Sequence, residues 1–189
     1  NPHVIVEAPK VVRFNTLGSV GSVLFLGDTA PADKSGPTTR AHGYFYPYSK
    51  TQKLLSSYDA VVANLETPIT TSDDPWWLWK KWVYKMHPDA VPALKKAEGD
   101  VVTRAHNPSS DYGRRGLLDS TQALDRAGIA HLGAGMSEAE ARRGLVIETG
   151  GNRLGVLSYL EDELVWRIWT GAIAFDTPFA KWAGSARMN

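Results

Sequence analysis

The chain has 189 residues, of which 43% are hydrophobic and 22% charged, so it can bury a core and is too apolar for a disordered segment. Its 21 Lys and Arg residues nearly balance its 20 Asp and Glu residues, which excludes the basic surface of a protein that wraps nucleic acid. The absence of cysteine excludes disulfides, thiolate metal sites and cysteine nucleophiles, and no apolar run reaches the roughly 18 residues that would span a membrane.

Three short apolar segments each end in polar residues, which is typical of buried strands that run into loops. They cover residues 23–28, 59–66 and 99–103. Helical patterns lie between and after them, at residues 48–57, 88–96 and 115–127. Two long loops, residues 29–47 and 67–85, interrupt this order next to strand ends, where long loops are commonly functional.

The next part of the chain continues the alternation. Residues 129–132 predict a short strand, and Ser137 predicts the capped start of a small helix. Residues 145–148 and 153–159 predict a hairpin across a Gly-Gly-Asn turn. Strands that alternate with helices predict an α/β sandwich whose sheet is mostly parallel, with flanking helices.

Polar residues gather at the carboxyl ends of the predicted strands, where ligands bind in open α/β sheets. Asp28 follows the first strand, Asn64 and Glu66 the second, and Asn107 the third. Because Asn64 and Glu66 are two apart on an extended segment, their side chains leave the same face and could meet one ligand. The alternatives for these residues are a turn-capping Asp and a solvated loop carboxylate.

Several motifs together carry a family resemblance. They are Gly27-Asp28-Thr29, the run from Asn64-Leu65-Glu66 to Thr70, Asp111-Tyr112-Gly113 with Gly116-Leu117-Leu118-Asp119, and the run from His131 to Gly135 with Glu140-Ala141. In this order they resemble the CapA family of capsule-synthesis and poly-γ-glutamate biosynthesis proteins, which has a metallophosphatase-like (calcineurin-like) α/β fold. The resemblance implies a metallophosphatase-like sandwich, largely its N-terminal half, over residues 22–160. Residues 1–21 would then be an N-terminal extension, and residues 161–189 an aromatic C-terminal segment.

The resemblance also implies a site for a divalent metal (Mn, Fe or Zn), built from three family motifs. It assigns Asp28, Asn64, Glu66 and Asn107 as metal ligands, with Asn107 in the third motif, Asn-Asn-His, which precedes Asp-Tyr-Gly. Carboxylate and amide oxygens, with added imidazoles, suit these metals. Two such metals would generate hydroxide near neutral pH and clamp the oxygens of a phosphoryl or amide-like transition state.

The sequence departs from the family pattern in two places. The family His falls on Pro108, whose side chain has no donor or acceptor, and His106 takes the place of the first Asn. His106 is therefore the candidate catalytic residue and substitute metal ligand, although a two-residue change of register moves a side chain further than a metal site tolerates. No His follows His131, so the later His motifs of the family are missing. The chain is either a piece of a longer protein or a reduced family member.

A cluster of tryptophans marks the second long loop. Its members are Trp76, Trp77, Trp79 and Trp82. With the two lysines among them, they predict either core packing or an exposed platform for an anionic or sugar polymer or for a protein partner.

Two functional hypotheses remain open. One is a metal-dependent hydrolase that acts on a cell-surface polymer such as poly-γ-glutamate or capsule. The other is a non-catalytic binding or assembly subunit that uses the tryptophan cluster. Because family members are commonly exported or membrane-associated, both hypotheses imply an extracytoplasmic or cell-envelope location, with any membrane contact made through a partner or a missing segment.

Overall fold

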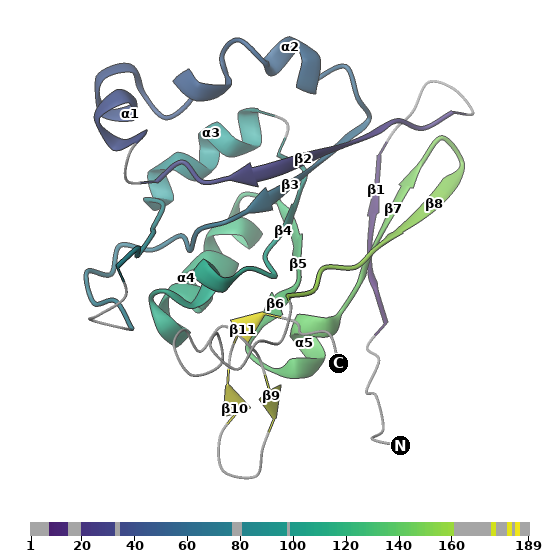
Figure 1. Cartoon of the computed structure of the whole chain (residues 1–189). Coiled ribbons are helices and arrows are strands. Elements are labelled where there is room, and N and C mark those ends of the chain that lie inside the picture. The colour runs from purple at the N-terminus through teal and green to yellow at the C-terminus, as the bar shows by residue number, and fades with distance from the viewer. Residues whose placement is uncertain are drawn as a thin grey trace.

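The computed structural model combines two larger β-sheets and two short two-stranded pairs with a layer of helices (Figure 1). It describes residues 8–14, 20–32, 35–76, 81–97, 99–160, 175–176, 181–182 and 184–185. None of the helices in these ranges is long and apolar enough to cross a bilayer.

The main sheet has four parallel strands in the order β2-β3-β4-β5. They are β2 (Val23–Thr29), β3 (Ala60–Leu65), β4 (Val101–Thr103) and β5 (Ala130–Leu132). Each lies where an apolar segment of the sequence predicts a strand, and all four run in one direction. The α/β prediction with a mostly parallel sheet is thus confirmed. Parallel order brings the carboxyl ends of all four strands to one edge of the sheet.

The second sheet has the order β1-β7-β8. The predicted hairpin forms it, with β7 (Leu145–Thr149) antiparallel to β8 (Asn152–Val156). Its turn needs two residues with positive φ, and Gly150 and Gly151 supply them with φ values of 55° and 74°. The strand β1 (Lys10–Arg13) pairs in parallel with β7. A sheet strand therefore forms within the predicted N-terminal extension.

The helices are mostly short. Those before β4 are α1 (Gly36–His42), η2 (Tyr46–Tyr48), α2 (Gln52–Leu55), η3 (Pro88–Ala90) and α3 (Val91–Lys96). Those after it are η4 (Asn107–Ser110), α4 (Gly113–Arg126) and α5 (Glu138–Arg142).

Three of these helices differ from the sequence prediction in instructive ways. The predicted helix at 48–57 shortens to the four residues of α2. The predicted helix at 88–96 divides into η3 and α3, because Pro92 lacks an N–H and fits the first turn of a new helix. The loop predicted at 29–47 contains α1, which also carries a proline in its first turn. The cap at Ser137 is confirmed, since its side chain accepts a hydrogen bond from the Glu140 N–H at 3.2 Å.

Short two-residue strands complete the described chain. They are β6 (Ala134–Gly135), β9 (Phe175–Asp176), β10 (Lys181–Trp182) and β11 (Gly184–Ser185). β11 pairs with β6, and β9 pairs with β10. Most of the predicted aromatic C-terminal segment lies outside the described residues.

Alternation along β3 divides the core into two layers. Ala63 and Leu65 face the helices, in a cluster completed by Ile69, Met86, Ala90, Val91, Leu94, Val102, Ala123, Leu124 and Ile129. Ala60 and Val62 face the second sheet, in a cluster completed by Val101, Ala130, Leu132, Leu145, Ile147 and Val156. The central strands β3 and β4 are buried on both faces and form a rigid base for side chains at the carboxyl edge of the sheet, whereas the edge strand β2 is largely exposed.

Candidate metal centre

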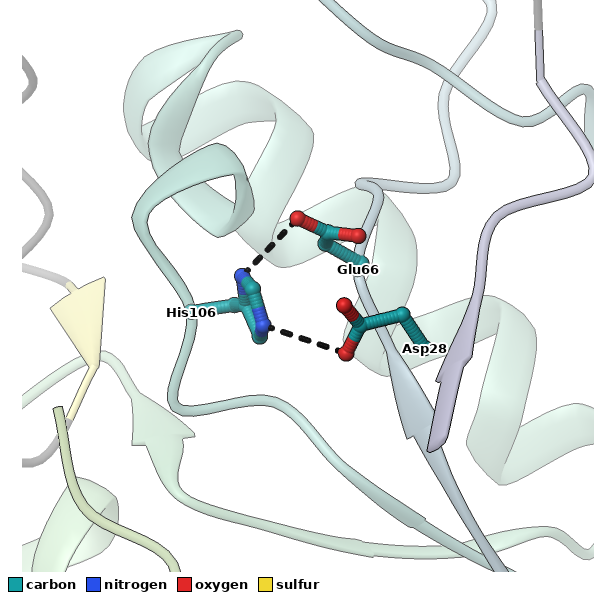
Figure 2. Close-up of side chains that lie close together, drawn as sticks. All are labelled: Asp28, Glu66 and His106. Atoms are coloured by element: carbon teal, nitrogen blue, oxygen red, sulfur yellow. Dashed lines mark ion pairs between the residues drawn. The ribbon is translucent and has the colours of Figure 1, made fainter. Parts of the chain in front are cut away.

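Three side chains converge at the carboxyl edge of the main sheet (Figure 2). Asp28 belongs to the end of β2, Glu66 follows β3, and His106 follows β4. The His106 ring lies between the two carboxylates, with Nε2 3.5 Å from Asp28 Oδ1 and Nδ1 3.5 Å from Glu66 Oε1. One ligand atom from each residue lies within 4.8 Å of the other two. We call these three residues the Asp-Glu-His triad.

A bulge in β2 turns the Asp28 side chain toward the other two residues of the triad. Phe25 pairs with Val62, but Asp28 pairs with Asn64, so β2 has one more residue than β3 between these pairs. Without the extra residue, Asp28 would pair with Leu65, whose side chain is buried against the helices. The bulge therefore moves Asp28 to the face of Asn64 and Glu66, as bulges near functional sites commonly do.

Asn64 joins the triad through a row of hydrogen bonds across three strands. Asp28, Asn64 and Thr103 are register partners in β2, β3 and β4. Thr103 Oγ1 donates to Asn64 Oδ1 at 2.8 Å, and Asn64 Nδ2 donates to Asp28 Oδ1 at 2.6 Å. Since a hydroxyl can donate or accept, the Asn64 amide could turn its oxygen toward the triad and still keep Thr103 as a partner.

The electrostatics of the triad favour a cation. Burial raises the pKa of Glu66, the electrostatic interaction with His106 lowers it, and the neighbouring Asp28 carboxylate raises it again, so that this pKa lies above its ordinary value. Asp28 is exposed over 56% of its side chain, whereas His106 and Glu66 are more enclosed. Two carboxylates that face one ring concentrate negative charge at a point that solvent can reach, and a divalent ion would neutralise it.

The donor set and its spacing fit a transition-metal ion. Two ligand atoms that each lie about 2.1 Å from a metal are at most about 4.2 Å apart. One nitrogen of His106 and one oxygen of each carboxylate lie within 4.8 Å of one another, so the triad would contract by well under 1 Å to satisfy this limit. Two carboxylate oxygens and an imidazole, with the Asn64 amide beside them, suit zinc, manganese or iron.

A comparison with known families decides what kind of protein carries this triad. The family model described as bacterial capsule synthesis protein PGA_cap matches residues 22–177. The chain belongs to this PGA_cap family. The resemblance to capsule-synthesis and poly-γ-glutamate biosynthesis proteins that the motifs indicate is confirmed, and the family model extends past the predicted end of the domain at residue 160.

Individual relatives of the PGA_cap chain agree with this assignment. It is 37% identical over 110 residues to a probable polyglutamine synthesis accessory protein of Mycobacterium tuberculosis (strain ATCC 25618 / H37Rv), covering 57% of the chain and 29% of the relative. It is 29% identical over 152 residues to an uncharacterized protein of Sinorhizobium fredii, covering 77% of the chain and 33% of that protein. It is 25% identical over 137 residues to the PGA biosynthesis protein CapA of Bacillus subtilis, covering 72% and 36%. The chain thus spans about a third of the length of the curated relatives it matches.

The third motif of the PGA_cap chain lies at the start of η4. Asn107 is the first residue of η4 and is not one of the three residues of the triad. Pro108 is buried in η4. His106, two residues before the position of the family His, is the side chain that faces the two carboxylates. The structure thus brings together Asp28, Glu66, His106 and Asn64, and the metal-ligand role of Asn107 stays a prediction.

A cavity of about 230 Å³ opens beside the triad. Glu66 lines it together with Ala30, Ala32 and Tyr84. Asp111, which is buried, accepts a hydrogen bond from the Tyr84 N–H at 2.9 Å and so fixes this wall of the cavity. The Asp111 carboxylate thus holds the loop that carries Tyr84.

The described part of the tryptophan cluster is exposed. Trp76 and Trp82 are 49% and 52% exposed, and Lys81 Nζ lies 5.2 Å from the Trp82 ring. The Trp76 N–H donates to the Asp111 carbonyl at 2.8 Å, which attaches this part of the loop to the start of α4. Trp77 and Trp79 lie outside the described residues.

Two residues near the triad escaped the sequence-based prediction. Thr103 supports Asn64, and Arg104 is buried just before His106. A threonine at a strand end has no distinctive signal. The sequence does contain a signal for Arg104, because a lone arginine just after the apolar run of β4 is unusual for an exposed loop.

Proposed function

We propose that this chain carries a divalent-metal centre of a hydrolase that acts on a cell-surface polymer. The observation that carries the proposal is the convergence of Asp28, Glu66 and His106 from three separate strand ends to within 4.8 Å. Exposed acidic residues are common on proteins, but an imidazole between two carboxylates at the carboxyl edge of a parallel sheet is the arrangement of a ligand site.

Each residue of this centre would have its own role. Asp28, Glu66 and His106 would hold the ion, and Asn64 would orient Asp28 or add its own oxygen. A bound divalent ion supplies Lewis acidity and lowers the pKa of a bound water. Tyr84 would form the wall against which a substrate group beside Glu66 is placed.

The substrate class follows from the family and its relatives. Relatives carry names that refer to polyglutamine synthesis, PGA biosynthesis and capsule biosynthesis. An anionic polymer of the cell envelope is therefore the proposed substrate, with the chain located at the cell envelope. Since the chain spans about a third of its relatives, a complete centre could include groups from the remainder of such a protein.

Metal binding by the purified chain tests the proposal. The metal-free chain is titrated with Mn²⁺ and Zn²⁺ by calorimetry, and bound metal is counted by plasma mass spectrometry after dialysis. We expect near-stoichiometric binding, which Asp28→Ala abolishes because it removes one of three ligands.

A matched control separates a real centre from general acidity. Asp89 lies 3.3 Å from His87 Nδ1, a spacing close to that in the triad, but this pair belongs to no group of three such donors among the described residues. Asp89→Ala should bind metal as the unmodified chain does. Absence of metal in the unmodified chain, or equal loss in both variants, would contradict the proposed centre.

A second function is supported by the exposed tryptophans. We propose as the alternative a non-catalytic binding subunit that holds a sugar or anionic polymer, or a partner protein, on Trp76 and Trp82. Both rings are half exposed, and Lys81 adds a positive charge beside Trp82. Poly-γ-glutamate binding by Trp82→Ala, compared with Leu118→Ala as an exposed apolar control, tests this role. A twofold or smaller loss in Trp82→Ala would contradict it.

A further inference from the structure

Arg104 is a buried residue close in the sequence to His106 of the triad. Only 2% of the residue is exposed, although arginine is rarely buried without specific partners. It follows β4 and precedes His106 by two residues. A buried guanidinium at this position costs desolvation energy, so its contacts indicate what it stabilises.

The Arg104 side chain connects the β4 loop to α4 and β5. Nη1 donates to Thr121 Oγ1 at 2.9 Å, and Nη2 donates to the Leu117 carbonyl at 3.2 Å, both on α4. Nη1 also lies 3.4 Å from His131 Nδ1 on β5. The planar fork of a guanidinium can serve these separate acceptors at once, which a lysine ammonium cannot do in the same geometry.

The Arg104 backbone holds the segment that presents His106. Its N–H donates to the Leu132 carbonyl at 2.9 Å, which extends the pairing of β4 with β5. Its carbonyl accepts from the His106 N–H at 2.9 Å and from Ser109 Oγ at 2.6 Å. The side chain thus anchors to the helix layer, while the main chain of the same residue fixes both His106 and the start of η4.

We propose that Arg104 is a positioning residue that sets the place of the His106 imidazole between Asp28 and Glu66. This role rests on the proposed metal centre for its functional meaning, but the placement itself exists without metal. It also accounts for His106 reaching the carboxylates from a register two residues away from the family His. An anchored loop, not the position in the motif, decides which side chain faces the site.

The first test measures His106 placement in the metal-free chain. Amide hydrogen exchange by NMR reports the hydrogen bond from the His106 N–H to the Arg104 carbonyl. Arg104→Met should speed exchange at His106 about tenfold beyond any change at the core amides of β3 and β4. Thr121→Val removes one acceptor and keeps the side-chain shape, so it provides a milder variant if Arg104→Met does not fold.

The second test measures the consequence at the metal centre. With Co²⁺ as the probe, Arg104→Met should weaken binding about tenfold and alter the visible absorption of bound Co²⁺, because the imidazole is no longer held in place. Arg104→Lys should restore affinity only in part, since it keeps the charge but loses the fork. Leu94→Ala, which damages the core on α3 away from Arg104, is the control for a purely structural effect.

The outcomes distinguish this inference from the proposed function. If the unmodified chain binds no Co²⁺ but Arg104→Met still frees the His106 amide, the metal centre fails and the positioning role stands. If Arg104→Met and Leu94→Ala change His106 exchange and the Co²⁺ spectrum alike, the positioning role is overturned while the metal centre stands. Full protection of His106 in Arg104→Met and in Thr121→Val would also overturn it.

Discussion

Two histidines lie on neighbouring parallel strands or just after them, and the charged groups around them differ. His106, after β4, lies between the carboxylates of Asp28 and Glu66 at the surface of the sheet edge. His131, within β5, is mostly buried and lies between the Asp125 carboxylate and the Arg104 guanidinium. Both rings contact charged groups on both nitrogens, so contact with an acid alone does not separate a ligand site from a structural one.

The difference lies in the balance of charge. Around His131 the Arg104 guanidinium and the Asp125 carboxylate compensate each other, Lys10 is a further cation nearby, and the ring serves as a neutral bridge. If His131 Nδ1 accepts from Arg104, its proton is on Nε2 and points to Asp125 Oδ1 at 3.2 Å. Around His106 two anions face a single ring, which leaves a charge that a divalent ion would compensate. An uncompensated pair of carboxylates is therefore the better sign of a cation site.

The largest expected effect comes from exchanging the same side chain in the two surroundings. His106→Gln should lower Zn²⁺ affinity about a hundredfold, because it removes the one imidazole of the triad. His131→Gln keeps a hydrogen-bonding group between Arg104 and Asp125, and its Zn²⁺ affinity should stay within about threefold. Calorimetric titration of both variants measures this difference. Equal losses of Zn²⁺ affinity would contradict the distinction between the two histidines.

Acid should reveal the second histidine through stability. Burial lowers the pKa of His131 to about 4, and the positive Arg104 contributes in the same direction. In the unfolded chain the ring has a pKa of about 6.5, so between these values the unfolded state binds more protons and stability falls as pH falls. The loss should reach about 2 kcal/mol by pH 5. Urea unfolding of the unmodified chain at pH 7.5 and pH 5 measures it.

The same measurement on His131→Gln isolates the contribution of this ring from that of other groups. Because glutamine does not titrate, the variant should lose about 2 kcal/mol less between the two pH values. A variant whose stability falls with pH as steeply as that of the unmodified chain would show that His131 is protonated in the folded state.

The sequence predicted the parallel sheet and the residues at its edge for a simple physical reason. Apolar runs that stop on polar residues are local signals, and parallel pairing carries their ends to one place. Asp28, Asn64 and Glu66 meet as that argument requires. The bulge that turns Asp28 to the correct face has no signal other than Gly27, since it depends on pairing with β3.

Two features depend on tertiary contacts that no local pattern encodes. His106 reaches the carboxylates because the β4 loop is anchored at Arg104, whose partners on α4 and β5 are 13 to 27 residues away. β1 is four residues long, and it becomes a strand only by pairing with β7 far along the chain. Spacing arguments fail where a loop is shaped by a distant element.

A smaller effect is expected from the charge of Asp125. Asp125→Asn retains an acceptor for His131 but removes the negative charge that stabilises the buried, positively charged Arg104. Since Asp125 is 56% exposed and partly screened, we expect a loss of about 1 kcal/mol in the free energy of unfolding. The difference should shrink at high salt. Unfolding at 0.05 and 1 M NaCl measures it, and a loss that is independent of salt would point to packing instead of charge.

The smallest effect is expected at a third histidine and carboxylate pair, on the surface at η3. His87 Nδ1 accepts a hydrogen bond from the Asp89 N–H at 3.3 Å and lies 3.3 Å from Asp89 Oδ2. With the nitrogen lone pair used as a cap, the carboxylate gains little from the ring, and both side chains are largely exposed. Asp89→Asn should therefore change the free energy of unfolding by less than about 0.5 kcal/mol. A larger loss of unfolding free energy, measured in urea, would show that proximity alone stabilises a pair of histidine and carboxylate. The balance of charge would then not explain the difference between His106 and His131.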